Sequence, residues 1–262
     1  MQIVRYQTRD SKIQYGWIQN DLIGKFEGSP FGDHQRGKPE IPLESVKLLA
    51  PHIPGKIISI GRNYLEHAKE VGAEPPKVPI IFLKPPSAII GPGGVIQLPP
   101  QSTHVDHEGE LAVYIGKRGR YIPADAAKNH ILGYTIANDV TARDLQRKDG
   151  QWVRAKGFDT FCPVGPWIET DFNPFDALIT THVNGQLRQM ASTRDMIFSI
   201  NQLIAFISSV MTLEAGDLIL TGTPAGIGPL VGGDVVKVAV EGIGELLNPV
   251  EKAKENPAYL QG

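Results

Sequence analysis

The stretch that decides the fold is His104-Val105-Asp106-His107-Glu108-Gly109-Glu110-Leu111-Ala112-Val113. Its second half continues into apolar residues that predict a buried strand, and Glu108 and Glu110 enter this strand two residues apart. Side chains two apart on a strand point to one face, so we expect the two carboxylates to lie side by side and to raise each other's pKa. A hard cation such as Mg²⁺, Mn²⁺ or Ca²⁺ would remove that repulsion. The alternative is a pair of solvated glutamates on an exposed strand.

Two histidines of the same stretch, His104 and His107, raise the alternative of a zinc site. Their order, H-x-x-H-E, differs from the H-E-x-x-H of helical zinc proteases. A loop that leads into a strand also does not hold residues three apart on one face. We therefore expect a structural or substrate-side role for these two histidines.

A third acid, Asp139, stands at the end of a predicted strand over 131–137, where side chains often line a site, although it could instead cap a following helix. Arg143 and Gln146 are three residues apart, so on a helix they share a face. The guanidinium of Arg143 suits a bidentate contact with a carboxylate, and its alternative is a surface ion pair with a neighbouring aspartate. Lys156 has small and apolar neighbours, and both a functional role and a role without function stay open for it.

His67 and Glu70 lie three residues apart on a short predicted helix over 64–71, which is expected to begin near a capping Asn63. A carboxylate beside an imidazole fixes its tautomer, and this suits a general base. The alternative is an ordinary side-chain pair on an exposed helix.

The segment 221–228 is glycine-rich but lacks the lysine of a phosphate loop. It follows an apolar strand, so we expect a rigid turn that could present Thr223. Cys162, which precedes a proline, is predicted to be a small buried thiol.

The 262 residues carry 26 basic and 28 acidic side chains, so no positive excess suits nucleic acid or a membrane surface as a partner. A single cysteine excludes an internal disulfide. The 28 glycines and 21 prolines predict many short elements and a turn-rich, mainly β protein. The N-terminus has no apolar signal region, so a cytoplasmic location is expected. The uncharged segment 196–213 follows an S-x-x-D capping pattern and predicts a buried amphipathic helix rather than a membrane span.

Composition shifts predict a small N-terminal β domain over 1–52 and a larger domain over 53–262. Within the first, 28–42 is rich in glycine, proline and charge and predicts a loop. Within the second, Asn184-Gly185 predicts a type I′ hairpin, and a strand over 235–240 is expected to end the β-rich part.

Six motifs, in order between about residues 57 and 240, resemble the fumarylacetoacetate hydrolase family. They are Gly61-Arg62-Asn63-Tyr64 with His67, Phe82-Leu83-Lys84-Pro85, His107-Glu108-Gly109-Glu110-Leu111, Asn138-Asp139-Val140-Thr141-Ala142-Arg143-Asp144, Ala155-Lys156-Gly157-Phe158-Asp159, and Leu220-Thr221-Gly222-Thr223-Pro224. The short chain is most similar to the compact acylpyruvase, oxaloacetate decarboxylase and hydroxymuconate isomerase branch. The resemblance implies a mainly β fold with some α, in which a mixed β-roll or sandwich catalytic domain follows the small N-terminal domain. It also implies a homodimer.

The resemblance implies a role for each matching residue. The implied ligands of Mg²⁺ or Mn²⁺, or of Ca²⁺ in a crystal, are Glu108, Glu110 and Asp139. The groups implied around the 2-oxo-carboxylate end of the substrate are Arg143, Gln146, Lys156 and Thr223. The groups implied in catalysis are His67 and Glu70 on a lid over the substrate, Lys84 in oxyanion stabilisation, and Gln146 and Lys156.

These roles imply a divalent-metal-dependent enzyme that acts on a small 2-oxo or enol carboxylate through a metal-bound enolate. The reactions expected first are decarboxylation of oxaloacetate and C–C hydrolysis of acylpyruvate-type 1,3-diketones, in which His67, oriented by Glu70, deprotonates water. Isomerisation of 5-carboxymethyl-2-hydroxymuconate or 2-hydroxyhepta-2,4-diene-1,7-dioate would use the same enolate and stays open. A non-catalytic, metal-dependent binding protein is the remaining alternative, and it would be expected to lack the lid base.

Overall fold

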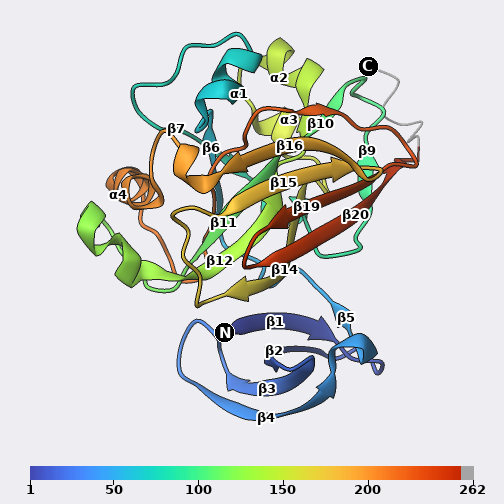
Figure 1. Cartoon of the computed structure of the whole chain (residues 1–262), viewed down its shortest axis with the longest axis vertical. Helices are drawn as coiled ribbons and strands as arrows, with labels where there is room; N and C mark the ends of the chain where they lie inside the picture. The colour runs from blue at the N-terminus through green and yellow to red at the C-terminus, as the bar shows by residue number, and fades with distance from the viewer. Residues whose placement is uncertain (255–262) are drawn as a thin grey trace.

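The first fifty residues form a small antiparallel meander, seen at the bottom of Figure 1. The computed structural model describes residues 1–254. The strands of the meander are β1 (Gln2–Gln7), β2 (Ile13–Gln19), β3 (Leu22–Gly28), β4 (His34–Pro42) and β5 (Lys47–Leu48). The predicted loop over 28–42 is wrong, because most of that segment is β4, which pairs with β3. β4 is the edge strand of its sheet, and an edge tolerates the prolines that suggested a loop.

The meander continues into the large sheet of the chain through β1, where Gln2 pairs with Glu169 and Ile3 with Ile168. Strand order in this sheet is β4-β3-β2-β1-β14-β12-β11-β17-β6-β7, and β8 pairs with β14 at its side. The further strands are β6 (Ile57–Gly61), β7 (Ile80–Lys84), β8 (Ile89–Ile90), β11 (Gly109–Ile115), β12 (Ile131–Asn138), β14 (Cys162–Glu169) and β17 (Leu218–Leu220). The mainly β fold is thus confirmed, whereas the division of the chain after residue 52 stays a prediction.

A second sheet, in the order β16-β15-β19-β20-β9, lies beside the first, and a small sheet has the order β13-β10-β18. Their strands are β9 (Ile96–Leu98), β10 (Val105–His107), β13 (Thr141–Ala142), β15 (Leu178–Val183), β16 (Gln186–Ser192), β18 (Gly228–Pro229), β19 (Val235–Val240) and β20 (Gly244–Lys252). The predicted hairpin is confirmed, with positive φ at Asn184 and Gly185 between β15 and β16. The expectation that the strands end at residue 240 is wrong: β20 follows, and its polar Asn248 and its Pro249 hid the alternation of buried residues.

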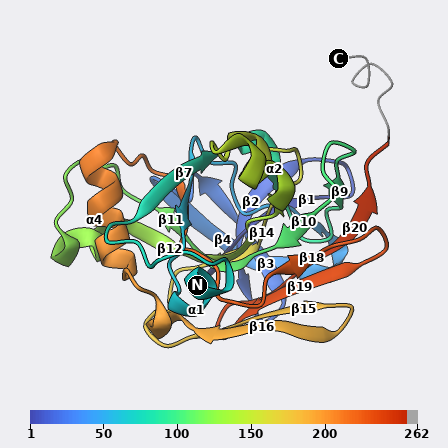
Figure 2. The same cartoon turned by 90° about the horizontal axis from the view of Figure 1, so that it is seen from above.

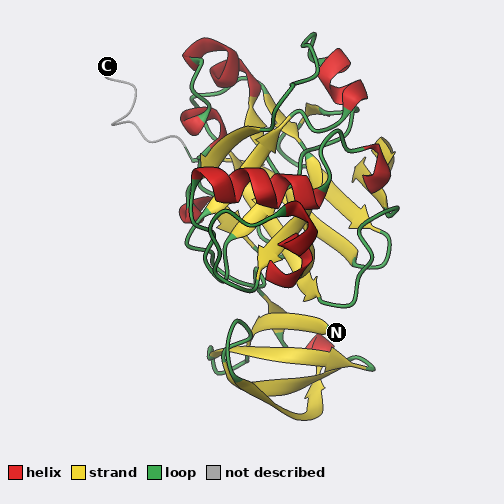
Figure 3. Cartoon of the chain, turned by 90° about the vertical axis from the view of Figure 1, so that its left-hand side faces the viewer, coloured by secondary structure: helices red, strands yellow, loops and turns green. Residues whose placement is uncertain are grey.

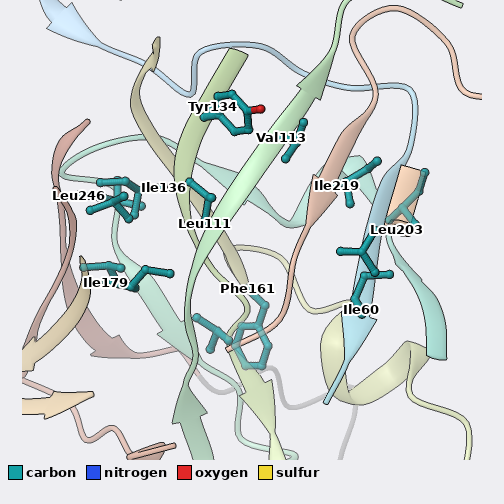
Figure 4. Packing of buried hydrophobic residues seen from close by; sticks show 14 of the residues in the cluster. Ile60, Leu111, Val113, Tyr134, Ile136, Phe161, Ile179, Leu203, Ile219 and Leu246 are labelled. Atoms are coloured by element: carbon teal, nitrogen blue, oxygen red, sulfur yellow. The ribbon is translucent and has the colours of Figure 1, made fainter. Parts of the chain in front are cut away.

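The main hydrophobic core lies where the two larger sheets face each other. Leu111 and Ile136 of the large sheet and Ile179 and Leu246 of the second sheet belong to one buried cluster (Figure 4). Cys162 is fully buried in a neighbouring cluster, as predicted, and burial raises its thiol pKa to about 12.

The helices are short: α1 (Leu65–Glu70), α2 (Arg143–Asp149), α3 (Val153–Lys156) and α4 (Ile200–Val210). α4 confirms the predicted amphipathic helix and runs across the front of Figure 3. It begins at a capping box of Ser199 and Gln202, whereas the predicted capping box of Ser192 and Asp195 caps a separate 3₁₀ turn. Within residues 1–254, no helix is both long and apolar enough to cross a membrane. α1 and α2 lie at the end of the molecule remote from the meander and face the viewer in Figure 2.

Asn63, expected to cap α1, instead ties three segments together. Its Nδ2 donates to the carbonyl oxygens of Phe198 (3.0 Å) and Thr221 (2.8 Å), and its Oδ1 accepts from the Phe198 N–H (2.8 Å). α1 begins after Tyr64 without a side-chain cap. Because Asn63 is fully buried, these bonds fix the entry to α1 onto the loop after β17.

Asn63→Ala should lower the free energy of unfolding by about 2–4 kcal/mol, because it leaves one buried and two partly buried backbone groups without these partners. Urea denaturation measures the change. The matched control is Asn201→Ala on the exposed face of α4, which should change stability by less than about 0.5 kcal/mol. Equal effects of the two substitutions would contradict the assignment.

Candidate active site

Three buried acids converge where β11 pairs with β12. One carboxylate oxygen each from Glu108, Glu110 and Asp139 lies within 4.8 Å of the others. The Glu108 N–H donates to Oδ1 of Asn138 (2.9 Å), and the Asp139 N–H donates to the Glu108 carbonyl (2.8 Å). The expected proximity of Glu108 and Glu110 is confirmed, and the alternative of solvated glutamates is wrong, since they are 5% and 1% exposed. Asp139 does not cap α2, which has no side-chain cap.

Three cations pair with two of these acids. Lys156 Nζ lies 2.8 Å from Glu108 Oε2 and 2.9 Å from Asp139 Oδ2, and Lys84 Nζ donates to Asp139 Oδ1 at 2.6 Å. Arg143 Nη2 donates to Glu108 Oε1. Burial alone would raise the pKa of Glu108, but Lys156 and Arg143 hold that pKa below its usual value. Burial would lower the pKa of Lys156, but Asp139 and Glu108 raise it.

Glu110 differs from the other two acids. Among the described residues no lysine or arginine forms an ion pair with it, and its Oε2 accepts from the Gly222 N–H at 2.6 Å. Burial and the charges of Asp139 and Glu108 raise the pKa of Glu110 well above its usual value. The expected mutual rise therefore holds for Glu110 and is wrong for Glu108, because the cations favour the ionised form of Glu108.

The cluster fits a divalent metal ion in its donor atoms and in its charge. Asp139 Oδ2 is buried and accepts no hydrogen bond, although the Lys156 ammonium lies 2.9 Å away as an ion pair. The buried charges of the cluster are the acids Asp106, Glu108, Glu110 and Asp139 and the cations Lys84, Arg143 and Lys156. Four negative and three positive charges leave one net negative charge when all are ionised, so the cluster attracts a cation. The triad of Glu108, Glu110 and Asp139 could therefore hold a metal.

Arg143 begins α2 and reaches inward. Its Nε donates to Asp106 Oδ2 (2.8 Å) and its Nη1 to Gln146 Oε1 (2.6 Å). The alternative of a surface ion pair is wrong, because the side chain is buried against Asp106 and Glu108. Asp106 was not among the predicted site residues, although it precedes Glu108 by two residues and the alternation that links the two glutamates includes it. His104 Nε2 lies 2.8 Å from Asp106 Oδ1, a structural contact of the kind expected for this histidine.

His67 and Glu70 contact each other on α1, as predicted. His67 Nδ1 lies 3.1 Å from Glu70 Oε2, and Glu70 Oε1 accepts from the Gly226 N–H at 2.9 Å. The imidazole is buried, so the alternative of an ordinary pair on an exposed helix is wrong for His67. The pair is anchored to the glycine-rich turn after β17.

Gln189 of β16, which the sequence analysis missed, fixes Thr223. Gln189 Nε2 donates to Thr223 Oγ1 (2.8 Å), while its Oε1 accepts from the Gly109 N–H (3.0 Å) and lies 3.3 Å from Nδ1 of His107. The Thr223 hydroxyl in turn donates to the Gly109 carbonyl (2.9 Å). The proton of this hydroxyl is therefore committed to the protein. No local pattern reveals Gln189, because its partners lie 34 and 80 residues away.

A cavity of about 240 Å³ opens beside the acid cluster and is lined by Glu108 of the triad, whereas Glu110 and Asp139 are not part of its lining. The predicted site residues that line it are His67, Glu108, Arg143, Gln146, Lys156 and Thr223. Lys84 is buried behind this lining and contacts Asp139, whereas Glu70 is exposed and contacts His67 from the outside. The structure thus brings the predicted residues into one site, and their roles stay proposals.

The β-rich fold, the buried carboxylate triad and the cavity lined by cations are the features expected of the family that the six motifs resemble. Residues 56–251 match the family model of the fumarylacetoacetate (FAA) hydrolase C-terminal domain, and residues 1–51 match the Rv2993c-like N-terminal model. The chain belongs to the fumarylacetoacetate hydrolase family, which confirms the resemblance read from its six motifs.

Named relatives cover most of the chain. It is 53% identical over 224 residues to Protein Rv2993c of Mycobacterium tuberculosis, covering 84% of each chain. It is 45% identical over 225 residues to the mitochondrial oxaloacetate tautomerase FAHD2B of Bos taurus, covering 81% of this chain and 72% of the relative. The crystal structure of the 5-carboxymethyl-2-hydroxymuconate delta-isomerase from Mycobacterium smegmatis matches with a TM-score of 0.90 and 48% identity, over 97% of this chain and all of that one.

Glu110→Gln tests the metal site without breaking an ion pair. In the metal-free protein the folded pKa of Glu110 lies above its usual 4.5, so the native state holds this proton more tightly than the unfolded state does. The resulting stability is present below pH 4.5 and is lost as the pH rises toward the folded pKa, by up to about 1.4 kcal/mol per pH unit. Glutamine keeps the neutral form, so the variant should be more stable than wild type at pH 8 in EDTA, with the gap shrinking toward pH 4.5. Urea unfolding measures this.

The same substitution should weaken Mg²⁺ binding by tenfold or more in titration calorimetry, because it removes one charged ligand. The matched control is Glu251→Gln, an exposed acid of β20, which should leave pH dependence and Mg²⁺ affinity unchanged. Wild-type behaviour of Glu110→Gln in both measurements would refute the metal site.

Proposed function

We propose that this protein is a divalent-metal-dependent enzyme that shifts a proton within small 2-oxo or enol carboxylates, as a tautomerase or isomerase. The observation that carries the proposal is the His67–Glu70 pair beside a cavity that also exposes Glu108, Arg143 and Lys156. The cavity lining therefore combines a candidate base, His67, with two cations that could bind a carboxylate, next to the candidate metal site. Two relatives, at 45% and 48% identity, are named as a tautomerase and an isomerase, and both names describe proton shifts.

Glu108, Glu110 and Asp139 would hold Mg²⁺ or Mn²⁺. Such an ion, when bound, supplies a Lewis acid that favours loss of a proton from the carbon next to a 2-oxo group. Lys84 contacts Asp139 and does not line the cavity, so we assign it a positioning role, in which its hydrogen bond orients this carboxylate. It would thus support oxyanion stabilisation from behind the site.

Arg143, Gln146 and Lys156 would bind the 2-oxo-carboxylate end of the substrate. The Oε1 of Gln146 accepts a hydrogen bond from Arg143 Nη1. Within residues 1–254 its Nε2 has no acceptor, so this amide nitrogen could donate to a substrate carboxylate. Thr223 borders the same space, but its hydroxyl proton is held by Gly109, so this hydroxyl would meet a substrate as an acceptor.

His67 would move the proton. Because Nδ1 faces Glu70 Oε2, the neutral ring keeps its proton on Nδ1 and leaves a lone pair on Nε2. Nε2 would take a proton from the carbon next to the 2-oxo group, the electron pair of that C–H bond would form a C=C bond, and the π pair of the carbonyl would move to the 2-oxo oxygen. The Lys156 and Arg143 charges favour this oxyanion. His67 would then return the proton to the oxygen, or to a more distant carbon in a conjugated substrate.

C–C hydrolysis of acylpyruvates is the second candidate, since an imidazole–carboxylate pair equally suits deprotonation of water. Decarboxylation of oxaloacetate would use the same binding groups. A non-catalytic binding protein is disfavoured, because that role gives no reason for a paired and buried His67. The homodimer and the cytoplasmic location stay predictions.

The test is tautomerisation of oxaloacetate, followed by the ultraviolet absorbance of its enol, with Mg²⁺ and with EDTA. His67→Asn should lower kcat by about 100-fold or more, because it removes the general base. Mg²⁺ affinity should stay within twofold of wild type, since His67 is not part of the acid triad.

The control is His34→Asn, an exposed histidine of β4, which should match wild type. A wild-type rate in His67→Asn would overturn the assignment of the base. If Mg²⁺-dependent hydrolysis of acetylpyruvate were found without tautomerisation of oxaloacetate, the second candidate would replace the first.

A further inference from the structure

Trp152 is a large side chain of the cavity lining to which the proposed function assigns no role. The cavity has an apolar side, which is made by Ile60, Val71, Phe82 and Trp152. Among these four, Trp152 has the largest side chain. It is half-buried, so part of the indole packs against the protein and part borders the open space. An apolar side chain of that size, beside the space where a substrate would lie, limits what the space accepts.

The indole of Trp152 is held in place by two contacts. Its ring packs edge-on against Phe82, with 5.2 Å between the ring centres and an interplanar angle of 76°. It also occupies the space that Gly61 leaves by having no side chain, because an added Cβ there would lie 2.9 and 3.1 Å from two atoms of the indole. The backbone is fixed as well, since the Trp152 carbonyl accepts the Lys156 N–H at 3.0 Å. Packing therefore holds this wall of the cavity in one position.

A row of side chains leads from Lys156 to Trp152. The Lys156 Nζ lies 5.0 Å from the ring centre of Phe82, and Phe82 contacts Trp152. Lys156 is the end of this row next to the acid triad, because its Nζ pairs with Glu108 and Asp139. A substrate whose 2-oxo-carboxylate end lies at Lys156 would therefore extend along Phe82 and meet the indole with its far end.

We propose that Trp152 determines which substrates this site accepts, by limiting the bulk of the group beyond the 2-oxo carbon. A short aliphatic group would fit between Lys156 and the indole, whereas an aromatic ring would overlap the indole. The substrates would then be 2-oxo or enol carboxylates whose far end is short and narrow. This proposal rests on the proposed function for the orientation of the substrate.

Binding is tested with a pair of 2-oxo acids that differ only at the far end: 2-oxobutanoate, with a methyl group, and phenylpyruvate, with a phenyl ring in its place. Titration calorimetry uses the whole Mg²⁺-loaded protein. Wild type should bind phenylpyruvate no more tightly than 2-oxobutanoate, although the phenyl ring offers more apolar surface. Trp152→Ala should shift the ratio of the two affinities toward phenylpyruvate by about tenfold or more, because an apolar space left by a removed side chain accepts a benzene ring. Trp152→Phe should give an intermediate ratio.

Turnover gives a second readout, as the ratio of kcat/KM for tautomerisation of phenylpyruvate to kcat/KM for tautomerisation of oxaloacetate. Both reactions are followed by the ultraviolet absorbance of the enol. Trp152→Ala should raise this ratio by about tenfold or more, and a partly misfolded sample cannot produce such a gain. The control is Trp17→Ala in β2 of the meander, which does not line the cavity and should keep the wild-type ratio in both assays.

Gly61→Ala tests the position of the indole. The added Cβ should displace the indole and weaken the binding of 2-oxobutanoate by about threefold or more. In the Trp152→Ala background the same substitution should change this affinity by less than about twofold, because the indole that the Cβ would meet is gone. Equal effects in the two backgrounds would contradict a wall that is fixed by Gly61.

An unchanged affinity ratio in Trp152→Ala would overturn the proposal. A wild-type preference for phenylpyruvate that Trp152→Ala abolishes would also overturn it, because the indole would then bind the ring rather than exclude it. Failure of the proposed function looks different. Wild type would then tautomerise neither substrate, while the shift of the affinity ratio in Trp152→Ala would remain and would still support the role of Trp152.

Discussion

Buried ion pairs between strand ends and short helices are the interaction on which the rest of this structure depends. Lys84 at the end of β7, Lys156 on α3 and Arg143 on α2 meet Glu108 and Asp139, which lie where the central strands end. Charges taken out of water must be paired, and removal of one partner from such a cluster costs about 3–5 kcal/mol. The pairs therefore hold short helices, which have little intrinsic stability, against the sheets. The same pairs keep the cavity above them lined with ordered polar groups.

The cluster is uneven, and this unevenness makes it a candidate site rather than a structural network alone. Glu108 and Asp139 have cations of the chain as partners, whereas Glu110 has a backbone N–H. Burial and its two acidic neighbours raise the pKa of Glu110, so the fold leaves one acid whose charge an outside cation would stabilise. The cations fix the geometry of two ligands beforehand. A metal ion held by the triad would therefore meet two carboxylates that are already positioned rather than three flexible side chains.

A continuous apolar run was enough to predict the central strand that contains Glu110, and the period of two along a strand was enough to predict the proximity of Glu108 and Glu110. Local patterns were not enough to predict the contacts of Asn63 and Gln189. The partners of Asn63 lie 135 and 158 residues away, and those of Gln189 lie 34 and 80 residues away. Capping preference favoured Asn63 at the start of α1, but bonds to the loop after β17 determine its position. β4 was missed for a different reason, since prolines on an edge strand look like a loop when pairing is unknown. Sequence patterns therefore identified the candidate site groups by residue type and spacing, and tertiary contacts supplied the groups that orient them.

The glycine-rich turn after β17 links the two halves of the candidate mechanism. The Gly222 N–H binds Glu110, and the Gly226 N–H binds Glu70, the partner of His67. Both glycines have φ near 100°, and an added Cβ would lie 2.6 Å from the Asn63 Cβ at the first and 2.0 Å from a carbonyl oxygen at the second. A side chain at either position would therefore displace the turn. Because one rigid segment holds the acid without a cation and also the partner of the base, a shift of that segment would disturb metal binding and proton transfer together. The turn resembles a phosphate loop in composition, but its backbone donors point to carboxylates of the chain itself.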